Sequence, residues 1–258
     1  MNIAGMTNVD LLIDVGNSRI KWYLSSHDNP SFSMRSFAYH EDNVIKEMAF
    51  HFAPECVEPF HRVLVSNVAG DQIKSKIIQW FVDRFNVTPE FAESCDEMHG
   101  LRSAYDHANQ LGVDRFLAIL GAQSLSGKAR VIVDCGTAVT IECVNGQNKF
   151  IGGVILPGLG LMRHSLANAT DALENISQVQ EISAFATNTR TAIAAGTIFA
   201  ITGAIQQSVA QLKTIENQYV ECFLSGGDGK LIQQYLDCNA EYHEDLVLKG
   251  LSIYFQAR

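Results

Sequence analysis

Apolar residues recur along the chain with two different periods, and these periods predict the secondary structure. Short apolar runs bounded by Gly, Asn or Asp predict strands at 9–15, 20–24, 63–68, 130–134, 139–144, 149–155 and 219–224. Apolar residues three or four positions apart predict helices at 44–52, 71–86, 115–124, 161–173, 191–212, 230–237 and 245–256. We expect loops at 25–36 and 92–111. Strands in bursts alternating with helices are typical of an α/β chain with mixed sheets.

The same strand–turn–strand pattern occurs twice. Residues 11–18 are an apolar run that ends in Asp-x-Gly and a polar residue, and residues 131–138 have the same form. Each run is followed by a second strand-like run. The repeat predicts two similar halves, which we place at 1–115 and 116–258, with the boundary region near 112–128.

Composition and charge narrow the class of protein. The chain has 258 residues, 47% of them hydrophobic and 18% charged, which is ordinary for a globular protein with a substantial core. Its net charge of −9 argues against general affinity for nucleic acid or for an anionic membrane. Residues 1–10 show no signal-peptide pattern, so we expect a cytoplasmic protein. The cysteines and histidines lack zinc-ligand spacing, so no structural transition metal is predicted.

The first repeat, residues 14–21, has the chemistry of a phosphate-binding turn. Backbone N–H groups of a tight turn, with the Asn17 and Ser18 side chains, can donate hydrogen bonds to phosphate oxygens. Asp14 can hold Mg²⁺ directly or through water, and Lys21 can neutralise phosphate charge. Alternatively, this stretch is an Asx-type hairpin turn with a surface lysine. The residues concerned are Asp14, Val15, Gly16, Asn17, Ser18, Arg19, Ile20 and Lys21.

The second repeat offers an acid and a hydroxyl in the same arrangement. Asp134 ends an apolar strand, where a buried carboxylate is costly unless it is paired or binds a cation. Thr137 can donate a hydrogen bond to a phosphate. Either turn alone would be ordinary turn chemistry, but the recurrence of both favours phosphate binding.

A third candidate is the segment Gly112, Val113, Asp114 and Arg115. Asp114 can be the N-cap of the following helix. It can also accept a proton from an alcohol, while Arg115 holds an anionic group of the same substrate. Less specific signals are the glycine-rich segment 152–158, a helix cap at 188–189, and 225–228, which fits a simple turn or an adenosine-facing loop.

Five segments together resemble the motifs of the type III pantothenate kinase family. They are 14–21, 112–115, 134–138, 152–158 and 188–196, in the order that the family shows, and they extend over nearly the whole chain. Each motif is unspecific, but the ordered set is highly specific. The departure we notice is Ser18, where the family more often has threonine; the hydroxyl is kept.

The resemblance implies a fold and a reaction. The fold is that of the sugar kinase, actin and heat-shock ATPase superfamily: two ribonuclease-H-like (actin-like ATPase) domains, with mixed sheets flanked by helices and ATP between the halves. The reaction is transfer of the ATP γ-phosphate to the primary hydroxyl of pantothenate, which yields 4'-phosphopantothenate in the first step towards coenzyme A.

The resemblance also implies roles for single residues. Residues 14–21 and Thr137 would bind ATP, and Asp134 would bind a monovalent cation, either K⁺ or NH₄⁺. Asp114 would be the general base. Residues 112–115 and Tyr105 would bind pantothenate, and Thr189 would reach that substrate across a homodimer interface.

Two alternatives remain at this point. The chain could be a binding or regulatory protein that keeps the nucleotide site without catalysis, although its intact acids argue against this. It could also be a kinase of the same superfamily that acts on a sugar, which the context of residues 112–115 and the short length disfavour.

Overall fold

The computed structural model describes residues 9–26, 34–52, 60–168 and 182–256. They form two compact units: the described residues within 9–98, 105–124 and 245–256 make up the first, and those within 99–104 and 125–244 make up the second. These units differ from the expected halves. The helix α3 (Val113–Gln123) runs through the expected boundary, and the C-terminal helix α7 (Leu246–Gln256) belongs to the first unit.

The first unit contains a five-stranded sheet in the order β3-β2-β1-β4-β5. The strands are β1 (Val9–Val15), β2 (Arg19–Ser26), β3 (Arg35–Ala38), β4 (Arg62–Asn67) and β5 (Glu90–Phe91). β1, β2 and β3 are antiparallel neighbours, whereas β4 and β5 run parallel to β1. β3 begins inside the expected loop 25–36. Its pattern was too weak to predict because only Phe37 is buried among its four residues.

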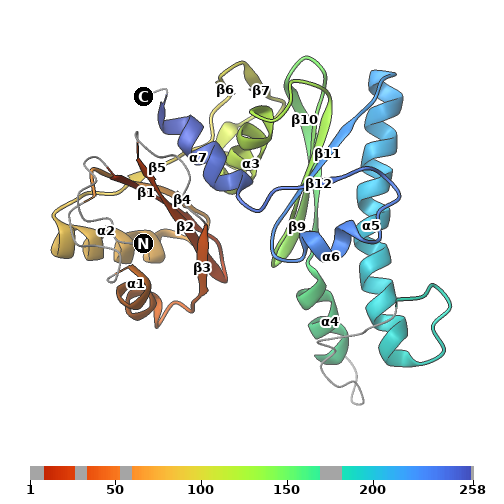
Figure 1. Cartoon of the computed structure of the whole chain (residues 1–258), viewed down its shortest axis with the longest axis horizontal. Helices are drawn as coiled ribbons and strands as arrows, with labels where there is room; N and C mark the ends of the chain where they lie inside the picture. Colours follow the sequence, from red (N-terminus) through yellow and green to blue (C-terminus); the bar gives the residue numbers. More distant parts are fainter. Residues whose placement is uncertain (1–8, 27–33, 53–59, 169–181, 257–258) are drawn as a thin grey trace. The chain divides into compact units, whose positions relative to one another are not determined.

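Helices cover both faces of this sheet. α1 (Val44–Phe52) and α2 (Asp71–Phe85) pack on one face, as the drawing of the first unit shows (Figure 1). α3 and α7 pack against each other and against β1 and β4 on the other face. They approach so closely that a Cβ at Gly250 would lie 1.9 Å from the Leu117 carbonyl oxygen. This contact requires glycine and lets α3 and α7 pack closely against each other.

The second unit repeats the topology of the first. β8 (Arg130–Cys135), β9 (Ala138–Val144) and β10 (Lys149–Pro157) are antiparallel neighbours, and β11 (Glu221–Ser225) and β12 (Glu241–Tyr242) continue in parallel from β8. The order β10-β9-β8-β11-β12 matches β3-β2-β1-β4-β5 strand for strand. The expectation of duplicated α/β halves with mixed sheets is therefore confirmed.

The region 92–111 is more structured than expected. It contains the short strands β6 (Glu97–Met98) and β7 (Leu101–Ser103) and a 3₁₀ turn at Ala108–Gln110. β7 pairs with the beginning of β10 through Lys149 and Phe150. Such two- and three-residue strands have no period of their own, so tertiary pairing rather than local pattern creates them.

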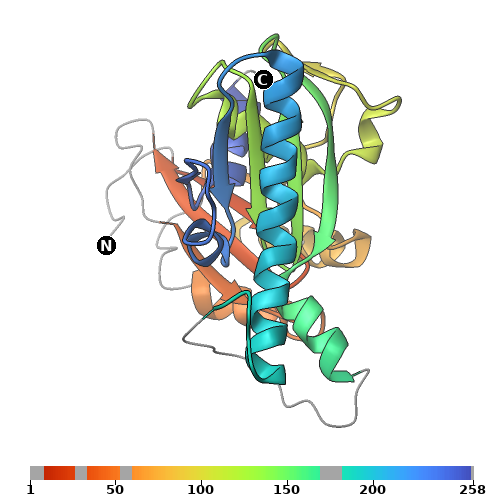
Figure 2. The ribbon, with the colours of Figure 1, turned by 90° about the vertical axis from the view of Figure 1, so that its right-hand side faces the viewer.

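Helices of the second unit lie on one face of its sheet. α5 (Thr189–Glu216) runs along β8 and β9, with α4 (Leu159–Asn168) beside its first half (Figure 2). The expected residues 169–173 of α4 lie outside the described chain, and α6 (Gly229–Gln233) is shorter than expected. By length and composition α5 could cross a membrane. Its buried residues, including Ile198, Ile201 and Ile205, instead pack in the core of this unit.

Candidate active site

Asp14 lies in a row of three polar residues that crosses the first sheet. It is the register partner of Lys21 on β2 and of Ser66 on β4. Side chains of neighbouring strands at matched positions point to the same face. Ile13 and Val15, on either side of Asp14, belong to the core under α1 and α2, so the row lies on the opposite face, where α3 and α7 pack. Asp14 is only 7% exposed.

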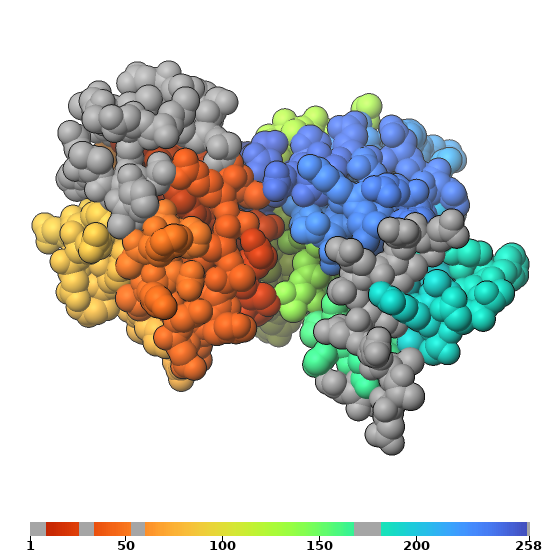
Figure 3. Space-filling view, turned by 60° about the horizontal axis from the view of Figure 1, so that its bottom comes forward, coloured from red at the N-terminus to blue at the C-terminus, as the bar shows by residue number. Residues whose placement is uncertain are grey.

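The turn after Asp14 presents its polar residues to solvent. The Gly16 N–H donates to the Arg19 carbonyl oxygen at 3.1 Å, which leaves Asn17 and Ser18 at the exposed tip. Atoms of this first hairpin, drawn in red, reach the surface in the space-filling view (Figure 3). The Arg19 guanidinium donates to Ser36 Oγ at 2.9 Å. Arg19 therefore shapes the turn through its carbonyl, while its side chain is held along β3.

Tyr39 supports this turn, and the sequence offered no signal for it. Its hydroxyl donates to the Gly16 carbonyl oxygen at 2.7 Å, and its N–H donates to the Ser18 carbonyl oxygen. Burial, together with the nearby charge of Asp14, raises the pKa of Tyr39. The phenol thus remains a neutral donor that holds the turn at neutral pH.

Asp114 lies in the first turn of α3 and is not its N-cap, which corrects one of the two interpretations. The N-cap residue is Gly112, whose carbonyl oxygen accepts from the Phe116 N–H at 3.0 Å. The Asp114 carboxylate accepts from the Arg115 N–H at 2.8 Å. An acid at this end of a helix is stabilised by the helix dipole, which favours the charged form that a base needs.

Arg115 and Tyr105, both expected at the substrate site, are brought together within the first unit. The Arg115 Nη1 donates to the Tyr105 hydroxyl at 3.2 Å, and the guanidinium carbon lies 5.8 Å from the centre of the tyrosine ring. Arg115 is 8% exposed. A buried, oriented guanidinium is suited to binding a carboxylate with two parallel hydrogen bonds.

A cavity of about 620 Å³ adjoins this segment inside the first unit. It is lined by the residues after β4, the start of α2, the residues after β5, and Gly112 and Val113. These parts follow the carboxyl ends of parallel strands, which is where α/β folds bind ligands. The space is large enough for a small acceptor molecule.

The second unit contains a matching row around Asp134. Asp134 is the register partner of Thr140 on β9 and of Ser225 on β11. Its Oδ1 atom is buried and has no hydrogen-bond partner within the described ranges. A buried carboxylate oxygen in this state fits a bound cation. Thr137 is exposed at the tip of the turn, where the Gly136 N–H donates to the Ala138 carbonyl oxygen at 3.0 Å.

Gly158 holds this second turn by close backbone contact. Its N–H donates to the Thr137 carbonyl oxygen at 2.9 Å, and a Cβ at this position would lie 2.1 Å from the Gly136 carbonyl oxygen. The close contact thus explains why the last residue of the glycine-rich segment expected at 152–158 is glycine. No larger residue fits there without moving the turn.

The loop after β11 lies next to the same turn. The Asp228 N–H donates to the Cys135 carbonyl oxygen at 3.1 Å, and the Tyr242 hydroxyl donates to the Gly226 carbonyl oxygen. Burial raises the pKa of Asp228, and the charge of Arg163 opposes this shift. Arg163 and Tyr242 have no motif around them, which is why pattern alone did not identify them.

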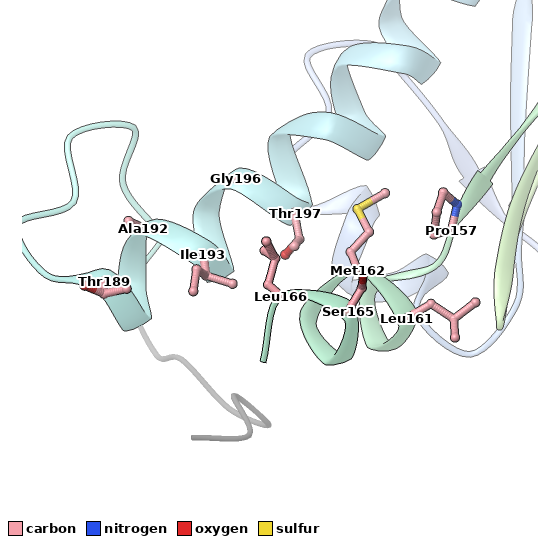
Figure 4. Close-up of a pocket in the computed structure, with 10 residues that line it drawn as sticks. All are labelled: Pro157, Leu161, Met162, Ser165, Leu166, Thr189, Ala192, Ile193, Gly196 and Thr197. Atoms are coloured by element: carbon pink, nitrogen blue, oxygen red, sulfur yellow. The ribbon is translucent and has the colours of Figure 1, made fainter. Parts of the chain in front are cut away.

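Thr189 is the first residue of α5 and is exposed. It lines an apolar cavity of about 590 Å³ between α4 and α5, together with residues such as Met162 and Ile193 (Figure 4). Asn188 is the N-cap of α5, and its side chain accepts from the Thr191 N–H at 2.9 Å. The expectation that 188–189 caps the helix is confirmed for Asn188.

The predicted site residues therefore fall into two sets. Residues 14–21, Tyr105 and 112–115 belong to the first unit, whereas Asp134, Thr137 and Thr189 belong to the second. Within the described parts of the chain, no three His, Cys, Asp or Glu side chains are grouped as a metal site. Magnesium usually takes one or two carboxylates and completes its shell with water and phosphate, so single acids such as Asp14 suit it.

Comparisons with known proteins match most of the sequence to one family. The family model described as type III pantothenate kinase matches residues 10–211. A type III pantothenate kinase of Janthinobacterium sp. (strain Marseille) is 36% identical over 253 residues, covering 93% of this chain and 95% of that protein. One from Verminephrobacter eiseniae is 35% identical over 246 residues, covering 93% and 94%.

Solved structures show the same fold at lower identity. A Campylobacter jejuni protein described as a candidate Baf family transcriptional activator superposes with a TM-score of 0.63 at 20% identity, over 96% of this chain and 98% of that one. A candidate 2-dehydro-3-deoxygalactonokinase from Sinorhizobium meliloti has a TM-score of 0.61 at 12% identity, with the same coverage. At these identities the likeness concerns the fold alone.

Proposed function

The chain belongs to the type III pantothenate kinase family, and on this premise we propose which of its residues carry the reaction. It phosphorylates pantothenate with ATP as co-substrate, in coenzyme A biosynthesis. The geometry within each unit supports a role for each of the residues concerned.

Asp114 is the general base that accepts the proton of the pantothenate primary hydroxyl. The support is its place at the start of α3, next to the cavity that Gly112 and Val113 line. Phosphoryl transfer has a loose transition state, so a base of low pKa suffices when it orients the alcohol. Arg115, held by Tyr105, binds the carboxylate at the other end of pantothenate.

Residues 14–21 and Thr137 bind the ATP phosphates. The exposed tips of both turns offer N–H groups and hydroxyls, which is the donor set that phosphate oxygens need. Asp14 holds Mg²⁺ through water, and Lys21 compensates phosphate charge. The fit rests on the burial of Asp14 at a strand end and on its position beside Lys21. The ion, when bound, would neutralise charge on the transferring phosphate.

Asp134 binds a monovalent cation, K⁺ or NH₄⁺. Its buried Oδ1 atom supports this assignment, because Thr140 replaces the lysine that accompanies Asp14 in the other unit. A bound ion would supply the missing positive charge.

The chain works as a cytoplasmic homodimer in which Thr189 reaches the substrate of the partner. The support is the exposed apolar cavity beside Thr189, because large apolar surfaces on soluble proteins mark interaction sites. Sedimentation equilibrium at micromolar concentration measures the mass directly. A monomeric mass would contradict this arrangement. Neither nucleic acid nor a membrane is expected as a partner of an acidic chain.

Asp114→Asn tests the assignment of the base. The amide keeps the size of the side chain but cannot take a proton, so kcat should fall about 10² to 10⁴-fold. ADP release is measured with and without pantothenate, and with K⁺ replaced by Na⁺. Asp83→Asn, at an exposed acid on α2, is the matched control and should leave the rate unchanged. Unchanged turnover in Asp114→Asn would remove this residue from the mechanism.

A further inference from the structure

Ser66 is a polar residue that the fold buries completely at the end of β4. Its exposed fraction is 0%, and its Oγ atom has no hydrogen-bond partner among residues 9–26, 34–52, 60–168 and 182–256. The great majority of buried polar side-chain atoms are hydrogen-bonded, and an unsatisfied one destabilises the folded state. Alanine would fill the same position without that cost. The hydroxyl therefore needs an explanation outside the stability of the ligand-free chain.

The position of Ser66 points to the nucleotide. β1 and β4 are parallel neighbours, and Ser66 is the register partner of Asp14. Neighbouring strands are about 4.8 Å apart. Val63 and Val65 face the core under α1 and α2, so Ser66 faces the other side of the sheet, as Asp14 does. The hydroxyl lies beside the carboxylate to which we assign the metal-bound nucleotide.

The second unit repeats this arrangement. Ser225 at the end of β11 is the register partner of Asp134, and it is 1% exposed. β11 corresponds to β4 in the matching strand order of the two sheets. Each acid of the two turns is thus accompanied by a buried serine on the neighbouring parallel strand. The recurrence ties the serine to the acid rather than to local packing.

We propose that Ser66 is a positioning residue for nucleotide binding, whose hydroxyl donates a hydrogen bond to the Asp14 carboxylate, or to a water on it, when ATP is bound with Mg²⁺. This rests on the proposed function, in which Asp14 receives the metal-bound phosphates. The hydrogen bond fixes the orientation of the carboxylate without contacting the nucleotide. In the ligand-free chain the Ser66 hydroxyl is buried and has no hydrogen-bond partner among the described residues.

The proposal predicts that removing the Ser66 hydroxyl leaves the stability of the free protein intact but weakens nucleotide binding. Removing the hydroxyl relieves an unsatisfied buried group in the free protein, so stability should not fall. It removes a charge-assisted hydrogen bond in the bound protein, so affinity should fall. A serine with a purely structural role would show the reverse: lower stability and unchanged affinity.

The experiment compares Ser66→Ala with the unaltered chain in two measurements. The first is the thermal unfolding midpoint without ligand, which should stay the same or rise. The second is the dissociation constant of ATP by calorimetry, without pantothenate, in Mg²⁺ and then in excess EDTA. We expect binding about tenfold weaker in Mg²⁺, which corresponds to ~1.4 kcal/mol, and a change below about twofold in EDTA. Ser66→Cys keeps a weaker donor on a slightly larger side chain and should fall between the two in the affinity measurement.

Ser124→Ala is the matched control in the same unit. The Ser124 hydroxyl donates to the Gly121 carbonyl oxygen at 2.7 Å at the end of α3, so its loss should lower the midpoint slightly and leave ATP binding unchanged. A midpoint lowered by several degrees in Ser66→Ala would show that the hydroxyl is satisfied in the free protein and would overturn the proposal. Equal loss of affinity in Mg²⁺ and EDTA, or no loss, would do so too. If the unaltered chain failed to bind ATP with Mg²⁺, the proposed function itself would fail.

Discussion

In each unit a row of three polar residues crosses the sheet, and the two rows differ in one charged residue. In the first unit the row is Lys21, Asp14 and Ser66; in the second it is Thr140, Asp134 and Ser225. The acid and the serine recur, whereas the lysine becomes threonine. Asp14 therefore has a cation from its own chain at the next strand, and Asp134 does not. The same scaffold thus places an acid beside a lysine in one unit and an acid beside a threonine in the other, and our proposed assignment of Mg²⁺ and a monovalent cation rests on this difference.

The turns that follow the two acids also differ, both in the residues at their tips and in the contacts that hold them. The first turn has two residues, Asn17 and Ser18, at its tip, and the Tyr39 hydroxyl holds it by donating to the Gly16 carbonyl oxygen. The second leaves only Thr137, and the backbone of Gly158 holds it. One turn is stabilised by a side chain and the other by direct backbone contact. A substitution at the backbone contact should therefore be the less tolerated of the two.

Exchanging each acid for its amide should give the largest contrast. Asp14→Asn should lower kcat/KM for ATP by about 10² to 10³-fold, because a group that acts on developing phosphate charge is lost. Asp134→Asn should lower the rate in K⁺ to the level measured in Na⁺, because its carboxylate no longer selects the ion. Initial rates over a matrix of Mg²⁺ and K⁺ concentrations measure both. An Asp134→Asn variant that K⁺ still activates would break the comparison.

Adding a methyl group to each turn should give the next effect. In Gly158→Ala the new Cβ would lie 2.1 Å from the Gly136 carbonyl oxygen and 2.7 Å from that of Thr137. Overpacking of this kind costs about 1 to 3 kcal/mol, and the displaced turn should also bind ATP more weakly. In Gly16→Ala the nearest atom is 3.4 Å away, so that variant should unfold close to the original midpoint. Urea denaturation measures both, and equal midpoints would contradict the assigned role of Gly158.

Alkaline pH should also destabilise the fold, and this effect should arise in the first unit. Two residues beyond Lys21, Tyr23 donates to the Leu248 carbonyl oxygen, and burial raises its pKa to about 12. A raised pKa stabilises the fold fully below pH ~10, and this stability is lost as pH rises towards 12. The loss should be about 2 to 3 kcal/mol, since one pKa unit corresponds to about 1.36 kcal/mol.

Tyr23→Phe isolates this contribution. The variant should lose about 1 kcal/mol at neutral pH with the hydrogen bond and then show a shallower decline between pH 10 and 12. The free energy of unfolding from urea titrations at several pH values measures the difference. Parallel curves for the two proteins would assign the alkaline loss to other groups.

Much of the fold was predictable because its main elements have strong local periods. The strands predicted at 9–15 and 130–134 are buried over most of their length, and the helix predicted at 71–86 buries Ile73, Ile77 and Phe81 at helical spacing. In each element the burial pattern follows the apolar pattern of the sequence. β3, β6 and β7 were missed for the opposite reason. They are short and mostly exposed, and it is their pairing with neighbouring strands of the sheets that defines them. The membership of α7 in the first unit was equally invisible, because a helix pattern does not say which sheet it covers.

The residues of the candidate site also divide into those that the sequence revealed and those that only the structure revealed. Asp14, Asp114 and Asp134 were found from motifs, since turn and strand-end acids stand out against apolar runs. Tyr39 and Ser66 were not, because an isolated tyrosine or serine carries no spacing signal, and only the register of β4 against β1 places Ser66 beside the acid. Helix capping at the start of α3 was also misassigned, because Asp114 lies within the first turn of the helix rather than before it.

The amino-acid sequence alone determined that this chain is a duplicated α/β protein with an acid at each of two strand ends, because alternating burial and turn chemistry are local properties. The tertiary structure decided which side chains accompany those acids. Strand register and helix packing join residues that are far apart in the chain, and no local pattern records such pairings.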